Sequence, residues 1–177
     1  AKDTDVALSV SAIALPWVLL PKEIAEVDDL ISYAYSRAYI EIERGNIAIT
    51  QNVKTELIRR KAVEHALGRA LKEHRIEAYF QPIFSVKEQK IIGAEALARL
   101  RDPDLGFIPP DEFIHVAEQT GDIMELGRQM FERVCIFLAS PQAKASDIRR
   151  INVNLSPAQC LNDQLASELF AIARRYQ

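Results

Sequence analysis

The chain has 177 residues, of which 49% are hydrophobic and 27% are charged, and this composition excludes a disordered chain. The length suffices for one domain of ordinary size plus part of another. The 22 Lys and Arg residues against 25 Asp and Glu residues give a net charge of −3, which argues against broad electrostatic binding to a nucleic-acid polymer.

The first 50 residues predict a strand, a helix and a second strand. Small apolar residues alternate over residues 6–15, apolar residues recur at helical spacing over 27–42, and residues 47–49 form a short β-prone run. The longest apolar stretch is interrupted by polar residues and Pro16 and is shorter than the roughly 20 residues that cross a bilayer. We expect a boundary near residues 50–52, because this piece is too small to be an independent domain.

The remaining residues predict helices and strands in alternation. A long amphipathic helix over residues 53–74 is followed by strands at 78–84 and 91–100, with a polar turn between them. Two helices follow, separated by a turn at Gly121 with Asp122 as the next N-cap, and then come a strand at 151–155 and a last helix from Pro157 to the end. Strands separated by helices favour βα units and a largely parallel sheet.

Two charged side chains stand on one face of the strand at 91–100. Side chains alternate along a strand, so Glu95 and Arg99 share a face, about 13 Å apart along the backbone. Charges on an otherwise apolar strand need a reason, because burying an unpaired charge is costly. A metal ion with an anionic ligand would supply one, and an edge strand with a solvated face is the simpler alternative.

Amide side chains occupy one face of the strand at 151–155. Asn152 and Asn154 share that face with Ser156, although parallel strands are usually apolar on both sides. An amide oxygen beside carboxylates suits Mg²⁺ or Mn²⁺ rather than zinc. The alternative is an Asn that caps the following helix or secures a turn. Gln81, in an aromatic strand before Pro82, either contacts a ligand or satisfies the backbone.

Four segments stand out in chain order: Tyr79-Phe80-Gln81-Pro82-Ile83, Glu95-Ala96-Leu97-Ala98-Arg99, Gly106-Phe107-Ile108-Pro109-Pro110 with Phe113-Ile114 and Ala117-Glu118, and Asn152-Val153-Asn154-Leu155-Ser156. Taken together, they resemble the EAL domain, the family of bacterial cyclic-di-GMP phosphodiesterases.

The resemblance implies an α/β fold, part of a (β/α)₈ TIM-type barrel, with the ligand site at the carboxyl ends of the strands. It implies that Glu95 is a catalytic metal-binding carboxylate and that Asn154 binds metal too, with Mg²⁺ or Mn²⁺ as cofactor. It also implies that Arg99 contacts a substrate phosphate and that Gln81 belongs to the substrate pocket. The reaction would convert cyclic-di-GMP to the linear dinucleotide pGpG.

A complete barrel takes about 250 residues, more than follow residue 53. We therefore expect residues 53–177 to be the N-terminal part of an EAL domain in a longer protein, with the later metal ligands and the catalytic lysine beyond the chain and the isolated chain inactive. Residues 1–52 loosely resemble the C-terminal end of a degenerate GGDEF domain.

Two further expectations concern the intact protein. The two cysteines, Cys135 and Cys160, favour reduced, buried thiols and a cytoplasmic location. For the parent protein we also expect an upstream sensor or membrane segment and a homodimer through the EAL domain. The alternatives to a phosphodiesterase are a cyclic-di-GMP receptor without catalysis and a signalling scaffold.

Overall fold

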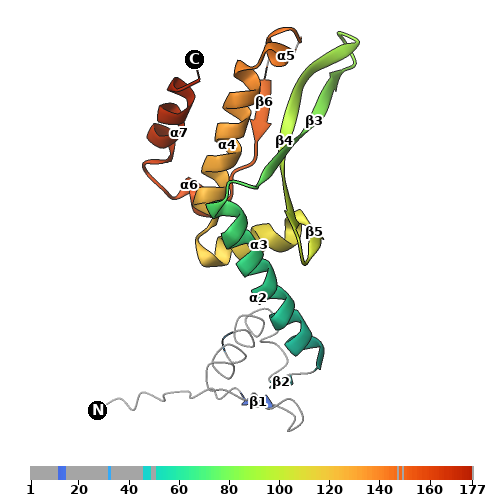
Figure 1. The fold of residues 1–177 in the computed structure, drawn as a ribbon, viewed down its shortest axis with the longest axis vertical. Helices are drawn as coiled ribbons and strands as arrows, with labels where there is room; N and C mark the ends of the chain where they lie inside the picture. The colour runs from blue at the N-terminus through green and yellow to red at the C-terminus, as the bar shows by residue number, and fades with distance from the viewer. Residues whose placement is uncertain are drawn as a thin grey trace, which may run out of the picture. The chain divides into compact units, whose positions relative to one another are not determined.

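The computed structural model describes residues 12–14, 32, 46–48, 51–146, 148 and 150–176 (Figure 1). The chain divides into two compact units, residues 1–59 and residues 60–177. Among the described residues, no helix combines the length and the apolar character that crossing a membrane requires.

In the first unit, two short strands pair in parallel. Strand β1 (Ala12–Ala14) lies beside β2 (Asn46–Ala48), with Ile13 opposite Ile47. β1 lies within the strand predicted at residues 6–15, and β2 overlaps the one predicted at 47–49. The helix expected over residues 27–42 and the rest of the first strand lie outside the described residues. Helix α2 (Gln51–Lys72) begins in this unit and continues into the second.

The second unit is built on a long antiparallel hairpin. Strand β3 (Glu77–Ser85) pairs with β4 (Lys90–Asp102), and β4 also pairs antiparallel with β5 (Gly106–Ile108) and parallel with β6 (Arg150–Val153). The expectation of a largely parallel sheet is therefore wrong for the described part of this unit. The turns after β3 and β4 are short and permit only antiparallel return, whereas β6 follows a helical crossover that parallel pairing needs.

Five helices follow β5 in the described part of the second unit: α3 (Pro110–Thr120), α4 (Ile123–Ala139), α5 (Pro141–Lys144), α6 (Pro157–Cys160) and α7 (Leu165–Arg174). Figure 1 shows α4 between the sheet and α7. Gly121 follows α3 in the left-handed conformation at φ 82°, as the sequence predicts. Asp122 occupies the N-cap position of α4 but makes no capping bond, because its Oδ2 accepts the Thr120 hydroxyl at 2.9 Å.

The last helix is shorter than expected, because the segment from Pro157 contains two helices rather than one. Between them, the side-chain oxygen of Asn162 accepts the backbone N–H of Gln164 at 2.9 Å. Such a local side-chain bond offers the backbone an alternative to helical pairing and therefore interrupts the helix. The cysteines are both free, but only Cys135 is partly buried, so the expectation of a buried Cys160 is wrong.

The core lies between one face of β4 and the helices. Phe113 of α3 is fully buried, and it belongs to a cluster with residues of α2, β4 and α4: Val63, Leu67, Ala70, Ala96, Leu100, Leu126, Met130 and Val134. Because side chains alternate on β4, packing Ala96 and Leu100 into this core turns Glu95 and Arg99 to the opposite face. The four-stranded sheet is open and does not close into a barrel within the described residues.

A buried carboxylate fixes the end of β4. Asp102 is only 5% exposed. Its carboxylate accepts a hydrogen bond from the Arg69 guanidinium of α2 at 2.7 Å, and two more from the backbone N–H groups of Asp104 and Leu105 at 3.0 and 3.2 Å. The hydrogen bond from Arg69 lowers the pKa of Asp102 below its ordinary value, against the opposing effect of burial. This contact joins α2 to the turn between β4 and β5.

Candidate functional site

The centre of the candidate site is a contact between β4 and the segment that follows β6. Glu95 lies opposite Asn152 in the parallel register of β4 and β6. One residue beyond the end of β6, the Asn154 side-chain amide donates a hydrogen bond to Glu95 Oε1 at 2.7 Å. The structure thus brings together the carboxylate and the amide that the sequence singled out, in a charge-assisted hydrogen bond.

Asn154 does not cap the helix that follows it. The N-cap of α6 is Ser156, whose hydroxyl accepts the backbone N–H of Ala158 at 3.3 Å. The Gln159 side-chain oxygen accepts the backbone N–H of Ser156 at 2.9 Å, which completes a capping box. The capping alternative for Asn154 is therefore wrong, and its side chain is available to the site.

Gln81 lies next to Glu95 on the neighbouring strand. The antiparallel register of β3 and β4 places Gln81 directly opposite Glu95. Residues paired across a sheet share a face, so Gln81, Glu95 and Asn152 form a polar row across three adjacent strands. Gln81 is exposed, which leaves its amide accessible to a ligand on this face.

Arg99 lies further toward the carboxyl end of β4, on the same face as Glu95. Its Nη1 donates to the backbone oxygen of Ala98 at 2.8 Å, and its guanidinium carbon lies 5.6 Å from the centre of the Tyr79 ring of β3. Stacking on an aromatic ring leaves guanidinium N–H groups available for an anion. The structure places Arg99 on the expected face but does not bring it against Glu95.

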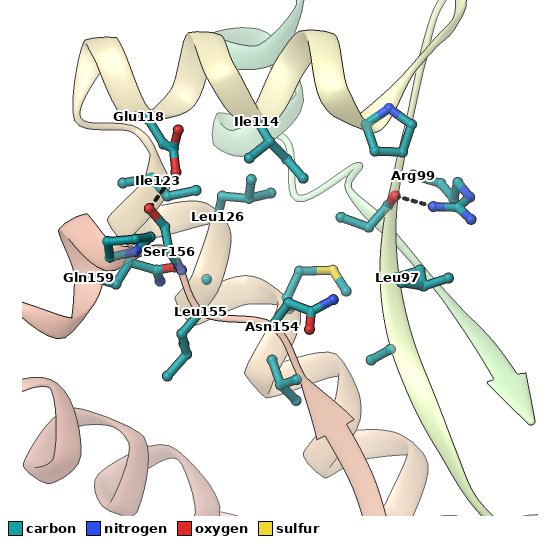
Figure 2. A pocket seen from close by; sticks show the side chains of 17 residues that line it. Leu97, Arg99, Ile114, Glu118, Ile123, Leu126, Asn154, Leu155, Ser156 and Gln159 are labelled. Atoms are coloured by element: carbon teal, nitrogen blue, oxygen red, sulfur yellow. Dashed lines mark hydrogen bonds between the residues drawn. The ribbon is translucent and has the colours of Figure 1, made fainter. Parts of the chain in front are cut away.

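A cavity of about 310 Å³ lies beside Arg99 and Asn154, and its lining does not include Glu95 or Gln81. It lies between the carboxyl-terminal half of β4, the segment after β6, and helices α3 and α4 (Figure 2). Arg99 and Asn154 line it together with apolar side chains that include Ile114, Leu126 and Met130. β6 runs parallel to β4 and ends opposite Ala96, and ligand sites of barrel-type α/β folds form beyond the carboxyl ends of such parallel strands.

The donor set at this site suits a hard divalent cation in part. A carboxylate and an amide are oxygen donors of the type that Mg²⁺ and Mn²⁺ prefer. The amide nitrogen faces Glu95 at 2.7 Å, and turning the amide would direct its oxygen to the same place. Within residues 51–176 as described, no group of three or more His, Cys, Asp or Glu side chains forms a candidate metal cluster. Glu95 and Asn154 therefore fit a divalent ion as two of its ligands.

Sequence reasoning missed the role of Gln159, which is 2% exposed and holds the backbone of Ser156. Two signals in the sequence could have found it. Ser156 and Gln159 have the spacing of a capping box. Gly127 is an isolated glycine in a helix, which often marks a close packing contact, and Gln159 packs against it. Glu118, which contacts Ser156, lies within a motif that carried the family resemblance.

The fold and this site define a part of a barrel-type α/β domain. The sequence model of the family described as "EAL domain" matches residues 64–177, and the chain therefore belongs to the EAL family. It is 37% identical over 114 residues to the signaling protein YkoW of Bacillus subtilis, a match covering 64% of this chain and 14% of YkoW. It is 33% identical over 91 residues to the cyclic di-GMP phosphodiesterase PdeL of Escherichia coli, covering 51% of this chain and 25% of PdeL.

Among solved structures, the chain resembles the MucR phosphodiesterase in its complex with c-di-GMP. The TM-score is 0.60 at 28% sequence identity, and the match covers 65% of this chain and 47% of that one. The open sheet thus matches part of an EAL barrel, as the sequence predicted. The chain spans about half of that structure and a smaller share of both relatives.

Proposed function

We propose that the intact protein carrying this chain is a cyclic-di-GMP phosphodiesterase, which hydrolyses cyclic-di-GMP to linear pGpG with Mg²⁺ or Mn²⁺. The observation that carries this proposal is the 2.7 Å contact between Asn154 and Glu95, where the parallel pairing of β4 and β6 ends. Membership of a family that includes the phosphodiesterase PdeL supports it.

Each site residue has a distinct role in this proposal. Glu95 and Asn154 hold the divalent ion, which when bound supplies a water activated for attack and charge neutralisation at the phosphodiester. Arg99 binds a phosphate oxygen through its guanidinium, which carries a fixed positive charge and several N–H donors. Gln81 donates or accepts a hydrogen bond to the part of the dinucleotide that lies over β3. Water adds to phosphorus and one ring P–O bond breaks, so the product is linear.

The isolated chain should not turn over substrate. Glu95 and Asn154 supply two ligands, whereas Mg²⁺ requires about six oxygen donors. The remaining protein ligands and a catalytic lysine are proposed to come from the rest of the intact protein.

The direct test is a turnover assay on the intact protein with cyclic-di-GMP and either Mg²⁺ or Mn²⁺, with pGpG separated by chromatography. Glu95→Gln should lower the rate at least about 100-fold, since even outer-shell partners of a metal contribute 10–100-fold. The matched control is Glu168→Gln, which makes the same change at an exposed position of α7. Equal rates in wild type and Glu95→Gln would remove Glu95 from the mechanism.

A cyclic-di-GMP receptor without catalysis, or a signalling scaffold, is the alternative. One aspect of the same contact favours it: the Asn154 amide presents its N–H rather than its oxygen to Glu95, so the two side chains satisfy each other. A receptor would bind cyclic-di-GMP in EDTA and yield no pGpG with either metal. A scaffold would show no heat of cyclic-di-GMP binding in calorimetry.

We further propose that residues 1–52 are the C-terminal end of a GGDEF-like domain and residues 53–177 the N-terminal part of the EAL domain. The parallel pairing of β1 and β2 supports an α/β character for the first segment, because parallel strands need a crossover between them. The intact protein is proposed to be cytoplasmic or tethered to a membrane through an upstream segment, and to form a homodimer through the EAL domain. Its molar mass by light scattering tests the dimer.

A further inference from the structure

The segment after β6 is attached to the two neighbouring helices at two points. In Figure 2 the Ser156 side chain points toward Glu118 of α3, and its hydroxyl donates to Glu118 Oε1 at 2.5 Å. The backbone N–H of the same serine donates to the side-chain oxygen of Gln159 at 2.9 Å. Ser156 is therefore held through both its side chain and its backbone.

The second point of attachment depends on a glycine. Gln159 is 2% exposed, and a Cβ placed on Gly127 of α4 would lie 1.8 Å from Gln159 Nε2. Any side chain at residue 127 would therefore displace the glutamine. Gly68, about one turn before the end of α2, has no such neighbour, because nothing lies within 4 Å of a Cβ built there. Packing therefore requires glycine at residue 127 but not at residue 68.

Both attachments act close to Asn154, which lies beyond the last paired residue of β6. The ladder with β4 ends at Val153, so no strand pairing fixes the Asn154 backbone. Both helices are packed into the core, since α3 buries Phe113, Val116 and Ala117 and α4 buries Leu126 and Met130. The contacts that hold Ser156 therefore restrict the position of Asn154, two residues earlier, whose side-chain amide must reach Glu95.

We infer that Glu118 and the Gln159–Gly127 contact are positioning elements that hold Asn154 in reach of Glu95 and thereby set the affinity of the site for its divalent ion. The inference deepens the proposed function and rests on it for the ion. Glu118 acts here through Ser156 and not by binding substrate. Outer-shell groups of this kind typically change metal affinity 10–100-fold when removed.

The test measures Mn²⁺ binding by calorimetry and backbone hydrogen exchange of residues 154–156, on the intact protein. Glu118→Ala and Gly127→Ala should each weaken Mn²⁺ binding about 10-fold and accelerate exchange in this segment. Glu118→Gln keeps an oxygen that accepts the Ser156 hydroxyl and should bind Mn²⁺ like the wild type. Gly68→Ala, the matched glycine control, should change neither measurement. A merely structural role for Glu118 would lower the melting temperature without this pattern of loss and rescue.

The outcomes separate this inference from the proposed function. Unchanged exchange at residues 154–156 in Glu118→Ala overturns the inference, whatever the wild type binds. Faster exchange with unchanged Mn²⁺ affinity overturns the link to the ion. A wild type that binds no Mn²⁺ contradicts the proposed metal-dependent function, and the exchange data alone then decide whether the segment is held as described. If Gly127→Ala fails to fold, Glu118→Ala carries the test, because that side chain is exposed.

Discussion

Replacing Asn154 by Asp tests whether a cation belongs between residues 154 and 95. The substitution removes the donor that now lies 2.7 Å from Glu95 Oε1 and places a second carboxylate there. Without a cation, the two like charges repel each other. With a cation bound, the two carboxylates are both anionic ligands of the same ion, and the variant should bind that ion more tightly than the wild type does.

The cost in the metal-free protein follows from the geometry. Two unit charges that relax to about 4 Å in a water-like medium repel by about 1 kcal/mol, and loss of the hydrogen bond contributes about 1 kcal/mol more. The sum of about 2 kcal/mol corresponds to a fall in melting temperature of about 4–8 °C for a chain of this size. Thermal unfolding of the 177-residue chain in EDTA measures the loss, and the same comparison on the intact protein in EDTA and in saturating Mg²⁺ measures the recovery.

In Mg²⁺ we expect the Asn154→Asp variant to recover most or all of this loss, and in 1 M KCl to recover the electrostatic part. Gln142→Glu adds the same charge at an exposed position of α5 and should show neither the loss in EDTA nor the recovery in Mg²⁺. Equal melting of Asn154→Asp and wild type in EDTA, or an equal Mg²⁺ effect on both, would refute the reasoning.

Three further predictions concern stability and reactivity. The pKa of Asp102 is lowered in the folded state, mainly by the Arg69 hydrogen bond, so its contribution is present above the unfolded pKa and is lost as pH falls through the folded pKa. Asp102→Asn should therefore flatten the acid side of a plot of urea midpoint against pH, and an unchanged slope below pH 4 would contradict this. Phe113→Ala removes a fully buried ring and should cost about 3–5 kcal/mol in urea unfolding; a loss below about 1 kcal/mol would count against the described core. Burial raises the pKa of the Cys135 thiol, so iodoacetamide should label the exposed Cys160 first, as read by mass spectrometry; faster labelling of Cys135 would be the contrary result.

The shared face of Glu95 and Arg99 could be predicted from the sequence, because alternation along a strand is a local property. The meeting of Glu95 with Asn154 could not, since it depends on the register of β4 against β6, two strands separated by helices. Only the family resemblance related these residues before the structure did. Local pattern also failed to exclude Asn154 as a helix cap, and the structure did so by giving that position to Ser156.

The alternation of helices and strands predicts parallel pairing, which is wrong for β3 and β4. The polar turn between these two strands is a local feature of the sequence and is too short for a crossover, so it indicates antiparallel pairing. The attachment of Gln159 to Gly127 was also out of reach as a contact, because it joins residues of different helices whose packing no local rule fixes. An isolated helical glycine was the one local indication of it.

The most direct test of the account is anomalous diffraction from crystals of the intact protein grown with Mn²⁺ at a concentration that supports turnover. We predict a Mn²⁺ peak in coordination contact with both the Glu95 carboxylate and the Asn154 side-chain oxygen. A peak that touches neither residue, or the 2.7 Å hydrogen bond between them persisting beside a Mn²⁺ ion bound elsewhere, would contradict it.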